Sequence, residues 1–349
     1  MTNPGEIDLT QSSKALEALL ALCKGRGRVL VLMQDNPDPD ALASAMALRD
    51  LLHGELGKRV VIAYGGVCGR AENRAMMELL HIDARRITPS EAGRFATVLM
   101  VDAQPTAGNN LAMTERLVDG VIDHHAEPRK AAARAPFHDV RPDYGATSTI
   151  LYEYLLAAGR RLSVNLATAL FYGIQSDTQD LGREAIPADV AAFQNLFDQA
   201  DTRKLARIRR APLPADYFEM LHESLENCIV AGNTVISVIQ NSKNPDIFAE
   251  IADLMLRLDG IRCSVCYGRY EETILLSVRT VDARSNAADR VMRVVRRLGA
   301  GGGHRTLAGG QIPAGAEPEN RLAAVHQRIL RVFARNHTPR PLFAAPPRL

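Results

Sequence analysis

The segment at residues 31–44 constrains the fold most, because an apolar run ends there abruptly in an acidic loop. It reads Val-Leu-Met-Gln-Asp-Asn-Pro-Asp-Pro-Asp-Ala-Leu-Ala-Ser, in which Asp35, Asp38 and Asp40 supply three carboxylates. After this loop, apolar residues recur at helical spacing until the glycines of residues 54–57, and a second short apolar run follows. A strand, a helix and a strand in this order predict a parallel sheet.

The alternation of strand-like and helix-like patterns continues through the first 200 residues. Further apolar runs predict strands at 28–33, 59–63, 95–101 and 117–122. Helical spacing predicts helices at 11–23, 41–52, 73–80, 111–116, 146–158 and 164–174, and one that begins at Pro187.

Acidic residues follow several of these predicted elements directly. Asp102 and Asp123 come at the ends of two strands, and Asp177 follows the helix at 164–174. The carboxyl ends of parallel strands meet at one edge of the sheet, where ligands bind in such folds. We therefore expect these carboxylates to converge with Asp38 and Asp40.

The composition changes near residue 201, where a basic run precedes two prolines. We expect a first domain at 1–200, a linker at 201–215, a second domain at 216–335 and a disordered tail at 336–349. A solvated helix face explains the basic run better than a polyanion contact. The expected fold class is α/β: a parallel-sheet N-terminal domain with helices on both faces, a smaller α/β C-terminal domain, and a cleft between them.

The composition indicates which kinds of ligand and which cellular location to expect. The chain of 349 residues has a net charge of +2, which gives little attraction to long polyanions and suits small anionic substrates better. It has no apolar stretch of membrane-spanning length, and its first residues lack a secretory signal, so we expect a cytoplasmic protein. Cys263 and Cys266 lie in a predicted strand without a second Cys or His pair, which favours ordinary strand residues over a zinc site.

Converging carboxylates are typical of sites for Mg²⁺ or Mn²⁺, which can bind in pairs, clamp a phosphate and activate water. A single Asp is more often a helix cap or turn residue, and this is the preferred interpretation of Asp35, Asp143 and Asp180. The Asp-His-His run at 123–125 adds imidazole nitrogens at a strand end, which a metal or a phosphate can use.

The order of these motifs resembles that of the DHH phosphoesterases, whose relatives include RecJ-like nucleases, nanoRNases and type II inorganic pyrophosphatases. The resemblance rests on four motifs in the first region: Asn36-Pro-Asp-Pro-Asp-Ala41, Val101-Asp102, Asp123-His124-His125 and Ser176-Asp177-Thr178. Ser277-Val-Arg279, Asn286 and the glycine-rich stretch at 301–310 resemble the DHH-associated domain of the nanoRNase branch.

This resemblance implies a site for two divalent cations, Mn²⁺ or Mg²⁺. One cation would be held by Asp38 and Asp102, and the other by Asp40, Asp102, His124 and Asp177. Asp123 would support His124, and His125 would face the substrate phosphate. The family usually has a metal-binding His where this chain has Gln34, and an amide oxygen is a weaker ligand that suits Mg²⁺ better.

In the second domain, the resemblance implies a grip on the distal phosphate or nucleotide. Arg279, Asn286, His304 and the backbone of Gly301, Gly302 and Gly303 would bind it, and Arg305 adds positive charge beside them. The side chains expected to act in catalysis are His125, Asp123, Arg279 and His304. The glycine run alone would be typical of a flexible loop or a helix C-cap.

The implied activity is hydrolysis of phosphate esters in short oligonucleotides or small nucleotides. We expect no binding to long duplex nucleic acid or to membranes, and the protein could form a homodimer. One alternative is a hydrolase of polyphosphate or another phosphoanhydride. A second is a nucleotide-binding regulator in which Gln34 has weakened catalysis.

Overall fold

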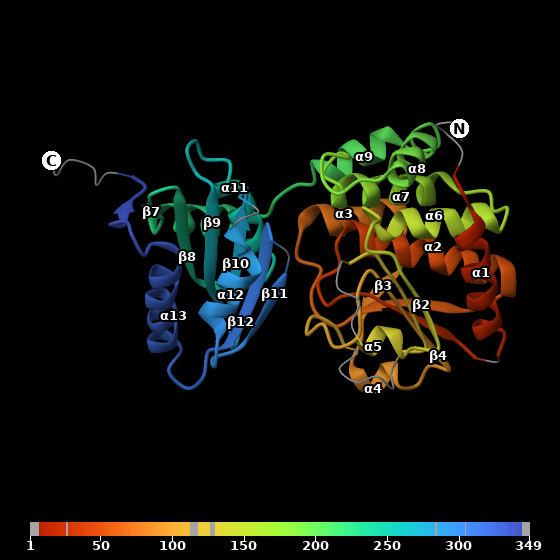
Figure 1. The fold of residues 1–349 in the computed structure, drawn as a ribbon, viewed down its shortest axis with the longest axis horizontal. Helices are drawn as coiled ribbons and strands as arrows, with labels where there is room; N and C mark the ends of the chain where they lie inside the picture. The colour runs from red at the N-terminus through yellow and green to blue at the C-terminus, as the bar shows by residue number, and fades with distance from the viewer. Residues whose placement is uncertain are drawn as a thin grey trace. The chain divides into compact units, whose positions relative to one another are not determined.

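The computed structural model describes residues 7–25, 27–111, 118–125, 130–282, 285–303 and 305–343. The chain divides into two compact units, Met1–Ala211 and Pro212–Leu349 (Figure 1), and the division lies within the segment predicted as a linker. Helix α9 (Thr202–Arg209) occupies much of that segment, because Leu205 and Ile208 are buried against the first unit.

The first unit is built on a six-stranded sheet in which every neighbouring pair of strands is parallel, as predicted. Across the sheet the strands are β3 (Ala84–Arg86), β2 (Val60–Tyr64), β1 (Val29–Leu32), β4 (Thr97–Val101), β5 (Gly120–Asp123) and β6 (Phe137–Val140). The sequence did not predict β3 and β6. Both are short edge strands, whose polar residues hide the apolar pattern that marks the central strands.

Helices cover both faces of this sheet, as predicted (Figure 1). Val29 and Val31 point into the larger core, whereas Leu30 and Leu32 point into the core on the opposite face. The larger core is covered by α1 (Thr10–Cys23), α2 (Pro39–Leu56), α3 (Ala71–Leu80), α6 (Thr147–Ala157), α7 (Val164–Asp177), α8 (Pro187–Phe197) and α9. The opposite face carries α4 (Pro89–Ala92) and α5 (Lys130–Ala133), and the helix predicted at 111–116 lies almost entirely outside the described residues.

Helix α2 follows the acidic loop and has clear end signals. Asp38 caps its first turn, Pro39 occupies the first helical position, and Gly57 ends it in the left-handed region with φ 61°. Gly54 was also expected to end this helix, but it lies inside it. The side chain of Arg160 occupies the space that a Cβ on residue 54 would fill. Asp38 is therefore both the N-cap of α2 and one of the carboxylates of the acidic loop.

The second unit has a seven-stranded sheet of mixed direction. Its strands, in order across the sheet, are β11 (Ala300–Gly303), β12 (Leu307–Pro313), β10 (Thr273–Thr280), β9 (Cys263–Tyr270), β8 (Thr234–Ser242), β7 (Ile229–Ala231) and β13 (Arg340–Pro341). Helices α10 (Ala215–Glu226) and α11 (Ile247–Met255) pack on one face, and α12 (Ala287–Val295) and α13 (Pro318–Phe333) pack on the other.

Two segments of the second unit differ from the sequence expectation. The glycine run forms the edge strand β11 rather than a loop, turn or helix cap, because it pairs with the equally glycine-rich β12. Part of the tail predicted to be disordered forms β13 beside β7, where Leu342 packs on the core; residues 344–349 lie outside the described range.

The two neighbouring cysteines are confirmed as strand residues. Cys263 belongs to the core under α12 and α13, whereas Cys266 belongs to the core on the α10 and α11 face. Side chains on opposite faces of a sheet cannot hold one metal ion together. Among the described residues, no helix combines the length and apolar character needed to cross a bilayer, and the cytoplasmic location stays a prediction.

Candidate metal centre

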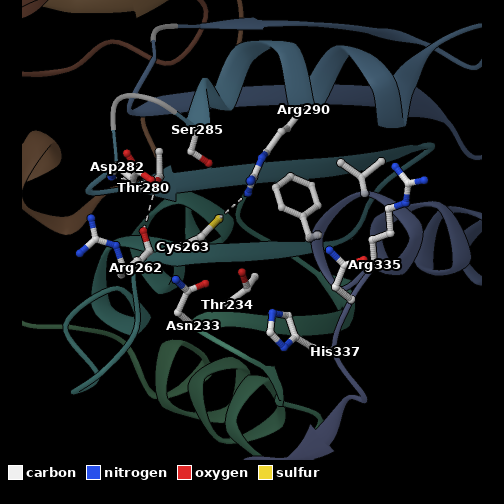
Figure 2. A pocket seen from close by; sticks show the side chains of 13 residues that line it. Asn233, Thr234, Arg262, Cys263, Thr280, Asp282, Ser285, Arg290, Arg335 and His337 are labelled. Atoms are coloured by element: carbon white, nitrogen blue, oxygen red, sulfur yellow. Dashed lines mark hydrogen bonds between the residues drawn. The ribbon is translucent and has the colours of Figure 1, made fainter.

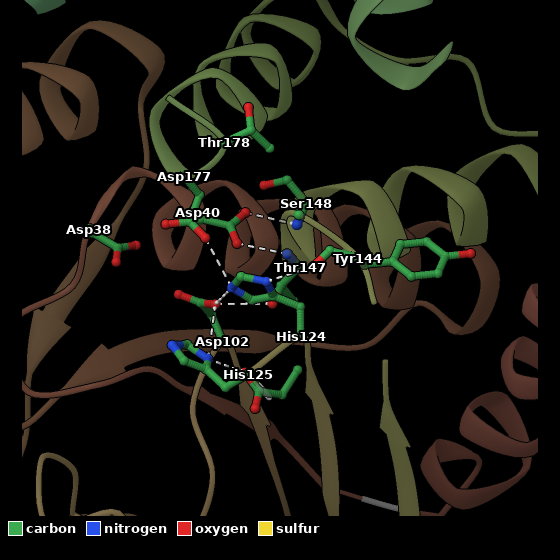
Figure 3. Close-up of polar contacts among 12 residues, drawn as sticks. Asp38, Asp40, Asp102, His124, His125, Tyr144, Thr147, Ser148, Asp177 and Thr178 are labelled. Carbon is green, nitrogen blue, oxygen red and sulfur yellow. Dashed lines mark hydrogen bonds and ion pairs between the residues drawn. The ribbon is translucent and has the colours of Figure 1, made fainter. Parts of the chain in front are cut away.

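The predicted acidic residues of the first unit meet at the carboxyl edge of its sheet (Figure 3). Asp40 follows β1, Asp102 ends β4, His124 follows β5, and Asp177 is the last residue of α7. Parallel topology brings the ends of β1, β4 and β5 together, and α7 points its final turn at the same edge.

Asp40 is fixed by the start of a neighbouring helix. Its carboxylate accepts hydrogen bonds from the backbone N–H groups of Thr147 at 2.7 Å and Ser148 at 2.8 Å. These N–H groups belong to the first turn of α6, where the helix dipole favours a negative charge. The side chain is 1% exposed, so its position is set by the fold.

Asp102 lies at the centre of the cluster and has an unusual backbone conformation. Its φ is 53°, in the left-handed region that Asp tolerates better than most residues. Its buried carboxylate accepts a hydrogen bond from Thr147 Oγ1 at 3.0 Å and lies 3.5 Å from Nε2 of His124. The turn therefore directs this carboxylate toward the other ligand candidates.

His124 is held at both ring nitrogens. Nδ1 lies 3.0 Å from the carbonyl oxygen of Tyr144, to which it donates a hydrogen bond. Nε2 lies 3.0 Å from Oδ2 of Asp177. In the neutral ring, a proton on Nδ1 leaves the Nε2 lone pair free for a metal ion.

Asp123 supports His125 and not His124, contrary to the sequence expectation. Its Oδ1 lies 2.7 Å from Nδ1 of His125, and its other oxygen accepts a hydrogen bond from Nε2 of Gln104 at 2.7 Å. The carbonyl of Tyr144 already engages Nδ1 of His124, so this ring needs no carboxylate behind it.

Gln34 binds Asp38 directly. Its Nε2 donates to Oδ2 of Asp38 at 2.8 Å, and its Oε1 accepts from Nδ2 of Asn109 at 3.4 Å. The other oxygen of Asp38 accepts from the backbone N–H of Ala41 at 2.9 Å. Gln34 thus positions Asp38 in the described structure, and its role as a metal ligand stays a prediction.

Two overlapping groups have the spacing of a metal site. The ligand atoms of Asp40, His124 and Asp177 lie within 4.8 Å of one another, and so do those of Asp102, His124 and His125. Asp38 belongs to neither group. Three of the four residues expected to hold one cation, Asp40, His124 and Asp177, lie together, and Asp102 lies 3.5 Å from His124; that they bind a cation stays a prediction.

Electrostatics within the cluster favour a bound cation. Burial and the charge of Asp177 raise the pKa of Asp40 to about 6, and burial with the charges of Asp40 and Asp38 raises the pKa of Asp102 well above its ordinary value. Burial opposes the charge on His124, but hydrogen bonding to Asp177 and that residue's charge raise its pKa to about 10. Crowded carboxylates that resist ionisation are stabilised by a divalent cation, so this donor set fits Mn²⁺ or Mg²⁺.

The predicted residues of the second unit have local partners. Nε of Arg279 donates to Oδ1 of Asp253 at 2.6 Å. Asn286 caps α12 by accepting from the backbone N–H of Asp289 at 3.4 Å. Arg305 has an exposed side chain, and His304 lies outside the described residues.

The glycines of β11 have a packing role that the motif alone does not reveal. A Cβ on Gly301 would lie 2.8 Å from Cγ1 of Val291 in α12, and one on Gly310 would lie 2.7 Å from Cγ1 of Val295. Glycine lets α12 lie directly on β11 and β12.

Sequence reasoning missed several residues that hold the site together. Thr147 and Tyr144 fix the candidate ligands, and the stretch at 145–149, Gly-Ala-Thr-Ser-Thr before an apolar helix, was an available helix-start signal. Arg183 donates from Nη2 to the backbone carbonyl of Asp177 at 2.8 Å and lies 3.8 Å from its carboxylate. No sequence signal marked Arg183.

Comparison with known proteins places the two units in one family. The model described as "DHH family, N-terminal domain" matches residues 28–174, and the model of the DHHA1 domain matches residues 231–334. A protein of Methanocaldococcus jannaschii described as uncharacterized is 35% identical over 288 residues, which cover 82% of this chain and 58% of that protein.

A protein of Streptococcus pyogenes named as a probable manganese-dependent inorganic pyrophosphatase is 28% identical over 153 residues. That match covers 43% of this chain and 48% of the relative, so the chain spans less than two thirds of either relative's length.

Solved structures share the fold. An exopolyphosphatase-related protein from Bacteroides fragilis has a TM-score of 0.70 at 14% identity, with 91% of this chain and 96% of that chain covered. RecJ from Thermus thermophilus in complex with Mn²⁺ has a TM-score of 0.51 at 15% identity, with 94% and 56% covered. The two family models together match most of the chain, and they show that it belongs to the DHH family.

Proposed function

We propose that this protein is a divalent-metal-dependent phosphohydrolase that acts on short oligonucleotides or small nucleotides. The observation that carries the proposal is the convergence of Asp40, Asp102, His124 and Asp177 at one sheet edge, in two groups with metal-site spacing. The manganese named for the pyrophosphatase relative and for the RecJ structure supports the choice of metal.

The chain offers ligands of the type that Mn²⁺ and Mg²⁺ prefer. Asp40, His124 and Asp177 would hold one cation, Asp102 would be shared, and Asp38 would complete a second site. A bound divalent cation supplies Lewis-acid polarisation of a phosphoryl oxygen and lowers the pKa of water.

His125 would bind the substrate phosphate. Burial opposes its charge, but the hydrogen bond and charge of Asp123 raise its pKa. Its side chain is 40% exposed, and Nδ1 is engaged by Asp123. A charged imidazole held in this way donates a hydrogen bond to a phosphate oxygen.

The second unit would contribute the grip on a distal phosphate or nucleotide. Arg279 is held by Asp253 and Ser277 with its side chain 16% exposed, so its guanidinium is preorganised. Asn286, Arg305, His304 and the edge-strand backbone of Gly301–Gly303 complete the proposed set.

A second candidate function is phosphoanhydride hydrolysis. The similarity to the pyrophosphatase relative, which extends over 153 residues, supports this candidate. Three expectations from the sequence stay predictions. They are a homodimer, no binding to long duplexes or membranes, and a cytoplasmic location.

Hydrolysis assays on a substrate panel test the function. The purified protein is given Mn²⁺ or Mg²⁺ with dinucleotides, phosphoadenosine phosphate, a cyclic dinucleotide, pyrophosphate and polyphosphate. We expect metal-dependent release of mononucleotide or phosphate from the nucleotide substrates, and none from an Asp38→Ala, Asp40→Ala double variant. Asp180→Asn is the matched control, because Asp180 is an exposed neighbour that accepts from Gln175 and belongs to neither ligand group.

The outcomes separate the candidates. Turnover of pyrophosphate or polyphosphate alone would favour the phosphoanhydride hydrolase. If neither metal gives turnover above the double variant while nucleotides still bind, the protein is a regulator and the enzyme proposal is wrong. A gain in Mn²⁺-dependent rate in Gln34→His would show that this position limits the metal site.

A further inference from the structure

A cavity of about 290 Å³ opens in the second unit (Figure 2). It lies where β8 and β9 begin and β10 ends, beside the C-terminal end of α13. The buried residues of its lining are Thr234, Cys263, Thr280 and Phe333.

The sheet separates this cavity from Arg279. Successive residues of a strand point to opposite faces, so Thr280 and Arg279 lie on different sides of β10. Arg279 bonds to Asp253 of α11, whereas Cys263 belongs to the core beneath α12 and α13. The cavity therefore lies on the face of the sheet opposite to Arg279.

The lining is strongly basic. It includes the side chains of Arg262, Arg290 and Arg335 together with His337, and Asp282 is the one carboxylate among the described residues that line it. Within the described ranges, no carboxylate lies at ion-pair distance from any of these three arginines. The cavity thus carries an excess of positive charge.

Arg290 is the best-fixed cation of the three. Its Nη1 lies 3.9 Å from Sγ of Cys263, and its Cζ lies 5.4 Å from the ring centroid of Phe333. Figure 2 shows it extending from α12 toward Cys263 across the cavity. Burial raises the pKa of the Cys263 thiol to about 11, so the thiol stays neutral and does not compensate the guanidinium charge near neutral pH.

We propose that this cavity binds a small phosphorylated molecule no larger than a mononucleotide. Guanidinium groups match the geometry and charge of a phosphate, and the hydroxyl group of Ser285 can add a neutral donor. A volume of about 290 Å³ is at the lower end for small-molecule pockets, which suits a ligand of this size.

Calorimetric titration of the full chain tests this site without the metal centre. The protein carries Arg279→Gln to disable the proposed substrate grip, and EDTA removes divalent ions. Adenosine 5′-monophosphate and inorganic phosphate are the probes, adenosine is the uncharged control, and citrate is the non-phosphate anion.

We expect the monophosphate to bind at one site and adenosine not to bind. Arg290→Gln should weaken binding about tenfold or more, the size of a lost charge-assisted hydrogen bond. Arg293→Gln is the matched control on the same helix, since Arg293 is exposed and absent from the lining, and it should bind as before. Arg262→Gln, at the rim, gives a second variant that leaves the core untouched.

Three results would overturn the proposal. They are absence of binding at millimolar probe, equal affinity in the Arg290→Gln, Arg262→Gln and Arg293→Gln proteins, and citrate binding as tightly as the monophosphate. The titration needs no metal or turnover, so its failure is distinguishable from failure of the proposed hydrolase.

Discussion

His124 shows how single residues prepare this site. The carbonyl of Tyr144 fixes one ring nitrogen, and Asp177 faces the other. The resemblance to the DHH phosphoesterases implied that His124 is a ligand. The sequence could not predict Tyr144, because a backbone carbonyl carries no side-chain signal.

Metal binding should release a proton from His124. Its pKa of about 10 keeps the ring protonated in the metal-free protein near neutral pH, whereas a ligand must be neutral. We expect release of at least one proton per bound Mn²⁺ near pH 7.5, measured by calorimetry in buffers of different ionisation enthalpy. Heats that do not depend on the buffer would contradict this assignment, and His124→Asn should reduce the number of protons released.

The stabilising effect of metal should depend on pH. Because the pKa of Asp40 is raised to about 6, its contribution to the stability of the metal-free protein is full below the unfolded value of 3.8 and is lost as pH rises through about 6. Mn²⁺ binds the ionised form, so the rise in Tm on adding Mn²⁺ should be large near pH 7.5 and small near pH 5. Equal rises at both pH values would show that Asp40 is not a ligand.

At the scale of secondary-structure elements, the start of α6 is a key support of the site. Thr147 donates to Asp102, while Thr149 in the same turn donates to Asp189 at 2.5 Å. The two buried threonines therefore form a matched pair, one bonded to a candidate ligand and one to a carboxylate outside both ligand groups.

Thr147→Val should weaken Mn²⁺ binding about tenfold, the effect of one lost hydrogen bond to a charged group. Thr149→Val should lower stability by a similar free energy and leave the Kd for Mn²⁺ unchanged. Both quantities are measured by metal titration and thermal unfolding. A similar loss of metal affinity in both variants would mean that the effect is general destabilisation.

The glycine run of β11 yields a stability prediction. A Cβ at Gly301 would press on Val291 and the carbonyl of Gly309, whereas one at Gly302 would meet nothing within 4 Å. Gly301→Ala should therefore cost about 1–3 kcal/mol of unfolding free energy, and Gly302→Ala should cost much less. Denaturant unfolding measures both, and equal losses would contradict the packing explanation.

Most elements could be predicted from periodicity, and the misses share physical causes. The central strands are continuous apolar runs, whereas edge strands such as β3 and β6 are short and partly polar. The glycines of β11 lack side chains, so no apolar pattern could mark a strand there. Pairing with β12, which lies later in the chain, decides its structure.

At the scale of the whole molecule, the linear order of the motifs predicted which residues would meet. Motif aspartates lie at the carboxyl ends of β1, β4 and β5, which are neighbours in a parallel sheet, and topology alone brings them to one edge. The supporting contacts depend on residues far apart in sequence, such as Thr147 and Asp102, and require the folded structure. The same holds in the second unit. The sequence singled out Arg279, but it did not predict that Asp253 would accept a hydrogen bond from it.

Anomalous diffraction from crystals grown with Mn²⁺ tests the central claim most directly. We expect a strong anomalous peak bounded by Asp40, His124 and Asp177, with Asp102 bridging it to a second peak toward Asp38. Absence of any peak among these side chains in crystals that bind Mn²⁺ elsewhere would contradict the assignment of this sheet edge as the metal centre.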